Sequence, residues 1–117
     1  MMTNYKIKYT KEFKKSIKKI TKQGKSIDKL LNVIDLLSNK QQLDSKYKDH
    51  ALYNDKKFKD CRDCHIEPDW ILIYKYLEEE IVLLLVNTGS HSEVLKKIKF
   101  SNQINMHCYF FILIYTK

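Results

Sequence analysis

Two helical patterns of apolar residues follow a short alternating segment at the start of the chain. Residues 5–9 alternate large and charged side chains, which is typical of a short, half-exposed strand. Thr10 is a residue type that caps helices, and from residue 11 onward apolar side chains recur at helical spacing. A fuller apolar stripe predicts a second helix over residues 27–37. The chain therefore opens in the order strand, helix, helix.

The middle of the chain predicts a long polar loop and then a three-strand antiparallel meander. Residues 39–59 are rich in lysine and aspartate, and we expect them to form a loop. Apolar runs predict three strands, at residues 59–66, 70–76 and 81–86. Residues 67–68 and 78–80 are the turns between them, and residues 87–90 close the last strand. With the two helices covering one face of the sheet, the predicted fold is an α+β domain.

The end of the chain differs in character from the rest. One domain over residues 1–95 accounts for the predicted elements, and residues 96–117 form a carboxy-terminal extension. An apolar octet at residues 108–115 is compatible with a fifth strand, a self-association edge or a tail without a role. The sequence leaves these three alternatives open.

The balance of charge points to a polyanionic partner. The 117 residues carry a formal net charge of +8, and the 22 basic residues comprise 21 lysines and Arg62. Basic contacts to phosphates release counterions, so nucleic acid is the leading candidate partner. A charge kept for solubility is the alternative. On the first predicted helix the lysines gather on the face opposite the apolar stripe, at Lys11, Lys14, Lys15, Lys18, Lys22 and Lys25.

Cellular location follows from what the amino terminus and the apolar runs contain. The first residues show neither an apolar core segment nor a small-residue cleavage site, so no secretory signal is predicted. The apolar run at residues 81–86 is too short to cross a bilayer. We therefore expect a cytoplasmic protein with no membrane partner, and its odd number of cysteines, three, predicts no disulfide framework.

A metal or haem site is the first alternative to test for the cysteines. Cys61, Cys64 and His65 have the spacing of a covalent haem attachment, and the two cysteines could form half of a zinc site. Haem attachment requires export, and a zinc site requires a second ligand pair. An odd separation also puts the two thiols on opposite faces of a strand. We therefore predict no metal and no cofactor, and interpret Cys64 as a small core residue, with Cys61 unexplained.

Three histidines and a carboxylate lie in segments that the predicted topology can bring together. His65 ends one strand and Asp69 begins the next across a tight turn, so their side chains can approach each other. His50 and His91 lie in loops, where catalytic groups are often displayed. Trp70 directly follows Asp69 in the sequence, and its ring could stack on a base. A single histidine is more often an ordinary surface residue, but the set forms a candidate acid/base site.

Three motifs in these segments resemble a known toxin family. They are Tyr47-Lys48-Asp49-His50-Ala51-Leu52, the run from Arg62 to Lys75 with His65-Ile66-Glu67-Pro68-Asp69-Trp70 inside it, and Thr88-Gly89-Ser90-His91-Ser92. In order and spacing the chain resembles the YafQ branch of the RelE toxin superfamily over about residues 5–95. The resemblance implies a RelE-like antiparallel sheet with two amino-terminal helices packed on one face.

The resemblance also implies an activity and a set of site residues. Family members are ribosome-dependent mRNA endonucleases, the toxins of type II toxin–antitoxin pairs. The 2′-hydroxyl of the mRNA attacks the adjacent phosphate in the ribosomal A site, without a metal. By motif position the catalytic residues would be His50, His65, Asp69 and His91. His91 would be the general acid, whereas activation of the 2′-hydroxyl would fall to Asp69 or one of the other two histidines, and the sequence does not divide these roles.

Substrate contacts and partners are implied in the same way. Trp70, Arg62 and Leu95 would contact the substrate, and Arg62 or a cationic histidine could offset charge on the phosphorane. The partners would be mRNA on the ribosome, with the lysine-rich helix face against 16S rRNA, and a cognate antitoxin of the ribbon-helix-helix type. Operator DNA would be bound only by the toxin–antitoxin complex.

Two features depart from the family pattern. Leu95 stands four residues after the last motif histidine, where family members tend to carry an aromatic residue, and the chain continues for 22 residues beyond it. The alternative function is therefore a non-catalytic, basic module that binds RNA or the ribosome, or a corepressor that acts with an antitoxin.

Overall fold

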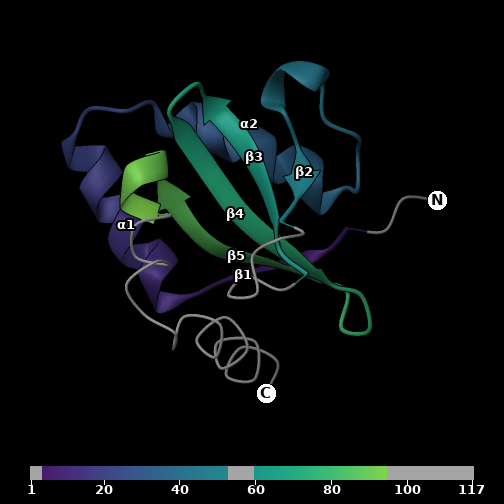
Figure 1. Cartoon of the computed structure of the whole chain (residues 1–117). Helices are drawn as coiled ribbons and strands as arrows, with labels where there is room; N and C mark the ends of the chain where they lie inside the picture. The colour runs from purple at the N-terminus through teal and green to yellow at the C-terminus, as the bar shows by residue number, and fades with distance from the viewer. Residues whose placement is uncertain (1–3, 53–59, 95–117) are drawn as a thin grey trace.

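The computed structural model describes residues 4–52 and 60–94 (Figure 1). The elements are β1 (Lys6–Tyr9), α1 (Lys11–Lys22), α2 (Ile27–Ser38), the short 3-10 helix η1 (Ser45–Tyr47), β2 (His50–Ala51), β3 (Arg62–Glu67), β4 (Trp70–Leu77) and β5 (Val82–Gly89). Residues 91–94 are helical. Leu95, Cys108 and the extension at 96–117 with its apolar octet lie outside the described residues, so the predictions made for them stay predictions.

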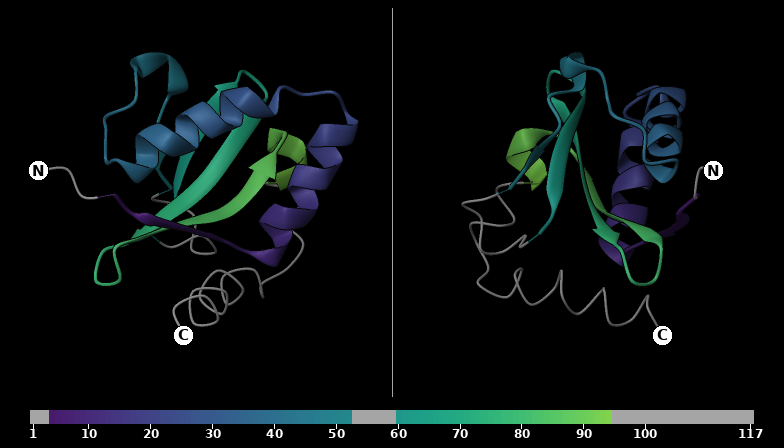
Figure 2. Two further views of the ribbon diagram at one scale, coloured as in Figure 1. Left: turned by 180° about the vertical axis from the view of Figure 1, so that it is seen from behind. Right: turned by 90° about the vertical axis from the view of Figure 1, so that its right-hand side faces the viewer.

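The strands form one five-stranded sheet in the order β1-β5-β4-β3-β2. Strands β3, β4 and β5 are the predicted antiparallel meander. Helices α1 and α2 both lie on one face of this sheet, as the right-hand view of Figure 2 shows, and residues 91–94 lie on the other. The predicted α+β class, the two helices and their placement on a single face are confirmed.

Helix α1 is anchored to the sheet through the side chain that caps it. The Thr10 hydroxyl accepts a hydrogen bond from the Phe13 backbone N–H at 3.0 Å and donates one to the Val86 carbonyl at 2.6 Å. Thr10 is fully buried, so both bonds are shielded from water. The cap that the sequence predicts therefore also fixes the start of α1 against strand β5.

Alternation along the strands separates two apolar layers. Cys64, Leu72, Tyr74 and Leu85 pack with α1 and α2 in the larger core cluster. Cys61, Ile71, Ile73 and Leu84 belong to a second cluster on the opposite face of the sheet. The prediction that Cys61 and Cys64 point to opposite faces is confirmed, as is the core position of Cys64; Cys61 proves to be a core residue as well, 1% exposed.

The structure corrects four details of the predicted sheet. Strand β1 runs parallel to β5, with Lys6 opposite Val82, so the sheet is mixed and not antiparallel throughout. The predicted long loop contains η1 and the two-residue strand β2, both too short to leave a periodic pattern. Strand β3 begins at Arg62, later than the predicted residue 59. Strand β5 continues to Gly89, because a bulge at Val86 restores its pairing with β4.

No helix in the described parts of the chain is long and apolar enough to cross a membrane.

Replacing Thr10 by valine is expected to destabilise the protein. The substitution keeps the volume but removes the hydroxyl, so the buried Val86 carbonyl and the Phe13 N–H both lose a partner, at a cost of about 1–3 kcal/mol. Urea denaturation measures this free energy of unfolding. The matched control is Thr10→Ser, which retains the hydroxyl, and a Thr10→Val protein within about 0.5 kcal/mol of that control would contradict the anchoring role.

Candidate active site

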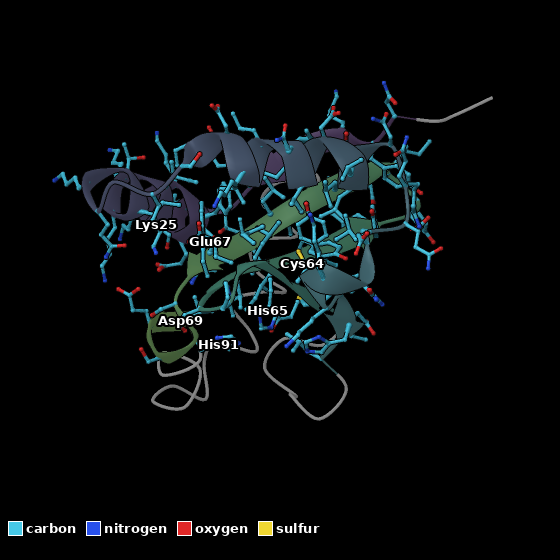
Figure 3. All side chains as sticks on the ribbon, turned by 90° about the horizontal axis from the view of Figure 1, so that it is seen from above. Lys25, Cys64, His65, Glu67, Asp69 and His91 are labelled. Atoms are coloured by element: carbon cyan, nitrogen blue, oxygen red, sulfur yellow. The ribbon has the colours of Figure 1, made fainter. Side chains whose placement is uncertain are left out.

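Three of the four motif residues meet at one end of the sheet, on the face away from the helices. His65 comes from β3, Asp69 from the turn between β3 and β4, and His91 from the residues that follow β5. Figure 3 shows these side chains next to one another, with the sheet between them and the helices. The His65 and His91 rings have centroids 4.9 Å apart. The expectation that these distant segments converge is therefore met in the described structure.

Asp69 orients His91 through two contacts to one carboxylate oxygen. Its Oδ1 accepts a hydrogen bond from the His91 backbone N–H at 3.3 Å and lies 3.3 Å from the His91 ring Nδ1. When Nδ1 carries a proton it donates to Asp69, which leaves Nε2 to face a substrate. The side chains of His91 and Asp69 are 37% and 77% exposed, so a substrate can reach them.

A capping box, which the sequence analysis missed, fixes the backbone at His91. The Ser90 hydroxyl accepts from the Glu93 N–H at 3.2 Å, and Glu93 Oε1 accepts from the Ser90 N–H at 3.3 Å. Ser and Glu three residues apart are the sequence signal for this motif. Gly89 precedes it with φ +153°, and a side chain there would meet Val94 at 3.3 Å, so the close approach favours glycine. Lys19 of α1 forms an ion pair with Glu93 and ties this segment to the helix.

His50 approaches the same face from strand β2. It lies opposite Asp63 of β3 in register, and its Nε2 is 3.9 Å from Asp63 Oδ2. Asp63 is 4% exposed, and burial raises its pKa, an effect opposed by the positive charges of His50, His65 and His91. Alternation places Asp63 two residues before His65 on one strand face, a signal that the sequence analysis did not use. Asp63 therefore links His50 electrostatically to the other two histidines.

The structure does not place Arg62 with the histidines. It lies opposite Tyr74 in register, and Tyr74 packs in the core cluster on the helix side of the sheet. The Arg62 Nε and Nη2 atoms donate to the two Asp49 carboxylate oxygens at 3.2 Å each. The Tyr74 hydroxyl donates to the same carboxylate. Burial by itself lowers the pKa of Arg62, but these hydrogen bonds and the Asp49 charge together raise it above its ordinary value. The expectation that Arg62 offsets charge on a phosphorane is therefore wrong, because Asp49 already neutralises it on the other face of β3.

Trp70 is also on the helix side, and it is a core residue. Its side chain is 0% exposed, and its indole N–H donates to the Thr88 hydroxyl at 2.9 Å. The Lys25 ammonium lies 5.7 Å from the ring centroid. The expectation that Trp70 presents a face for base stacking is therefore wrong, because the ring is enclosed by the sheet and the helices.

A basic cleft adjoins His65, and the sequence analysis missed it. It has a volume of about 530 Å³ and lies between α2, η1 and the turn that joins β3 to β4. Its lining includes Lys29, Lys46, Tyr47, Lys48, His65 and Glu67. Asp44 caps η1 by accepting from the Lys46 N–H at 3.0 Å, and Lys48 ends it with φ +49°. The segment that was predicted to be an open loop therefore contains a short helix. This helix lines one side of the cleft, and His65 lines another.

Comparison with known proteins gives consistent matches in sequence and in structure. A family model described as the bacterial toxin of type II toxin–antitoxin system, YafQ, matches residues 5–96. The mRNA interferase toxin YafQ of Escherichia coli (strain B / BL21-DE3) is 40% identical over 87 residues, which is 74% of this chain and 90% of that protein.

Two solved structures share the fold over nearly their whole length. The crystal structure of a metal-bound toxin from Helicobacter pylori has a TM-score of 0.72 and 40% identity, covering 77% of this chain and 98% of that one. The YafQ of the E. coli DinJ–YafQ toxin–antitoxin complex has a TM-score of 0.69 and 37% identity, covering 78% and 97%.

The metal named for the Helicobacter pylori toxin raises the question of whether this chain could hold one. Within residues 4–52 and 60–94, no three His, Cys, Asp or Glu side chains are grouped closely enough to bind a metal ion. Asp69 is instead turned to His91, and Asp63 to His50. The described residues therefore do not fit a metal site.

The family model covers most of the chain, and the relatives agree with it in sequence identity and in fold. The chain therefore belongs to the YafQ family of bacterial toxins from type II toxin–antitoxin systems.

Proposed function

We propose that this chain is an mRNA interferase, which cleaves mRNA in the A site of the ribosome by attack of a 2′-hydroxyl on the adjacent phosphate. The observation that carries the proposal is His91, which is held by Asp69 and lies beside His65, a residue that also lines a basic cleft. The relative from E. coli is named an mRNA interferase toxin, which supports the same activity here. The site of action would be the cytoplasm, where ribosomes translate mRNA.

The proposed reaction needs one group that takes a proton and one that gives a proton. A base removes the 2′-hydroxyl proton, the 2′-oxygen bonds to phosphorus, and the bond from phosphorus to the 5′-oxygen breaks. His91 protonates that departing oxygen through Nε2, because Asp69 occupies its other ring nitrogen. The same contact makes Asp69 an orienting group for His91, and so favours His65 or His50 as the base. The products are a 2′,3′-cyclic phosphate and a 5′-hydroxyl.

The cleft and the lysine-rich face of α1 suit two different stretches of RNA. Lys46 and Lys48 can contact mRNA phosphates beside His65, and Tyr47, which is partly buried between them, can stack on a base. The exposed lysines of α1 lie on a separate surface, and we propose that this surface contacts 16S rRNA. That surface would supply salt-dependent affinity without choosing the cleavage position.

A cognate antitoxin is the second proposed partner, and an apolar groove on the helix side suits it. The groove has a volume of about 350 Å³ and is lined by β1, α1 and α2 residues that include Ile7, Tyr9, Leu31 and Lys14. Leu31 is 53% exposed, and Ile7 and Tyr9 are each 44% exposed. Apolar side chains with an acidic neighbour would complement this groove and its Lys14. The YafQ in the E. coli complex is bound to the antitoxin DinJ. We propose an antitoxin of the ribbon-helix-helix type, whose complex with this chain binds operator DNA.

Replacing His91 by alanine is expected to lower mRNA cleavage on ribosomes by about a hundredfold or more, because the departing oxygen loses its proton donor. Ribosome association should stay close to wild type, since the site is a small part of the basic surface. Mapping mRNA 5′ ends after induction measures the cleavage. The control is Ser92→Ala at the exposed neighbouring position. Unchanged cuts in the His91→Ala strain would refute the assignment, and unchanged growth arrest without cuts would favour the non-catalytic alternative.

Reversing charge on α1 is expected to weaken ribosome binding. In the triple variant Lys15→Glu, Lys18→Glu, Lys22→Glu, three exposed cations on one helix face become anions, so affinity should fall and its salt dependence should flatten. Sedimentation with ribosomes at several salt concentrations measures both. The triple Lys→Arg variant keeps the charge and serves as control. Equal binding by the two triple variants would show that this face does not contact rRNA.

Replacing Leu31 by lysine is expected to weaken antitoxin binding while leaving cleavage intact. Leu31 is already half exposed, so the substitution costs little folding stability but puts a charge into the groove. Titration with the cognate antitoxin measures the affinity. Gln23→Lys adds the same charge at an exposed position outside the groove. If both variants bind the antitoxin equally well, the groove is not its binding surface.

A further inference from the structure

Asp63 is a buried carboxylate without the partners that such a group usually has. It lies on the same face of β3 as His65, opposite Ile73 of β4 and His50 of β2, and it is 4% exposed. Its Oδ1 has no hydrogen-bond partner within the described parts of the chain. Its Oδ2 lies 3.9 Å from the His50 Nε2. A buried carboxylate with an oxygen that has no hydrogen bond lowers the stability of the fold. Such a residue is therefore more readily explained by a role in function than by a role in folding.

The charged groups around Asp63 come from every segment of the site. His50 and Asp49 approach from β2 and the residue before it, His65 from β3 itself, and His91 from beyond β5. Burial raises the pKa of Asp63 most, the three histidines lower it, and Asp49 raises it. Asp49 is already bound to Arg62 on the other face of the sheet. The three imidazoles are therefore the groups that can stabilise the Asp63 anion.

The hydrogen bond on the far side of the His50 ring shows which proton the ring already carries. His50 Nδ1 lies 2.7 Å from the Lys48 carbonyl oxygen, and a carbonyl can only accept, so Nδ1 bears a proton. Nε2 then carries a proton only when the ring is cationic. The Nε2 side faces the Asp63 carboxylate, so a proton on Nε2 would point toward an anion. The His50 side chain is 52% exposed, so the ring can also face a substrate phosphate.

We propose that Asp63 is a positioning residue that holds His50 as an imidazolium, and that this cation offsets the charge that builds up on the phosphorane. The inference rests on the proposed nuclease function and deepens it. The resemblance left this role open to Arg62 or a cationic histidine, and the Arg62 guanidinium is neutralised by Asp49 on the opposite face. His50 neither gains nor loses a proton during the reaction. The base that accepts the 2′-hydroxyl proton is then His65, and the acid is His91.

The raised pKa of Asp63 determines how the free energy of unfolding changes with pH. A raised pKa means that the folded protein binds the Asp63 proton more tightly than the unfolded chain does. Stability therefore falls as pH rises from the unfolded to the folded pKa of this carboxyl, and it stays lower above that window. Asparagine at this position does not titrate and avoids the burial of a charge. Asp63→Asn should thus unfold at the same or a higher urea concentration than wild type at pH 8, although it should be the less active protein.

The test compares Asp63→Asn with Asp28→Asn, which removes the same charge from an exposed position on α2. Asp63→Asn is expected to lower cleavage on programmed ribosomes by about tenfold or more and to move the alkaline limb of the pH–rate profile to lower pH. Asp28→Asn should match wild type in both. His50→Gln should lose a similar factor, and the double variant Asp63→Asn, His50→Gln should lose little more than either single variant.

A measurement without substrate separates this inference from the proposed function. Ring ¹⁵N shifts of His50 should show both nitrogens protonated in wild type at a pH where Asp63→Asn shows a single proton on Nδ1. If no variant, wild type included, cleaves mRNA, the nuclease function fails while these shifts still test the pair. Unchanged shifts, an unmoved pH–rate profile, or strictly additive losses in the double variant would each overturn the role of Asp63. So would a large fall in urea stability of Asp63→Asn, which would mark a purely structural residue.

Discussion

Alternation along strand β3 is the constraint on which the rest of the structure depends. One set of its side chains, including Arg62 and Cys64, faces the helices, and the other, including Asp63 and His65, faces away. Arg62 therefore meets Asp49 and Tyr74, and its charge is paired with that of Asp49. Asp63 and His65 are left on the face that His91 reaches from the end of β5. A shift of one residue in the pairing with β4 would exchange these two sets and remove the site.

Two carboxylates on opposite faces of the sheet have opposite roles. Asp49 receives a forked pair of bonds from Arg62 and a hydroxyl from Tyr74, which satisfies it fully and braces η1 against β3. Asp63 has no such partners among the described residues, and its neighbours are imidazoles. Paired charges of the first kind hold a fold together. A buried carboxylate of the second kind, with one oxygen that has no hydrogen bond among the described residues, raises the cost of folding, and such groups gather at functional sites.

The sequence predicted the parts of this fold that leave periodic patterns. The two helices, the Thr10 cap, the meander and the separation of Cys61 from Cys64 all follow from local spacing. The parallel pairing of β1 with β5 does not, because it depends on which edge strand the chain meets after folding. Strand β2 and η1 are too short for a pattern. The convergence of His65, Asp69 and His91 was expected from the turn and the motifs, whereas the burial of Trp70 depends on which face of β4 the helices cover.

In the proposed reaction His91, oriented by Asp69 beside His65, completes strand scission by a 2′-hydroxyl. The end groups of the RNA products test it most directly, because they record which oxygen attacked the phosphate. The purified chain, incubated with programmed ribosomes, is predicted to leave a 2′,3′-cyclic phosphate on the upstream fragment and a 5′-hydroxyl on the downstream one. A 3′-hydroxyl paired with a 5′-phosphate would mean that water attacked, and would contradict the account.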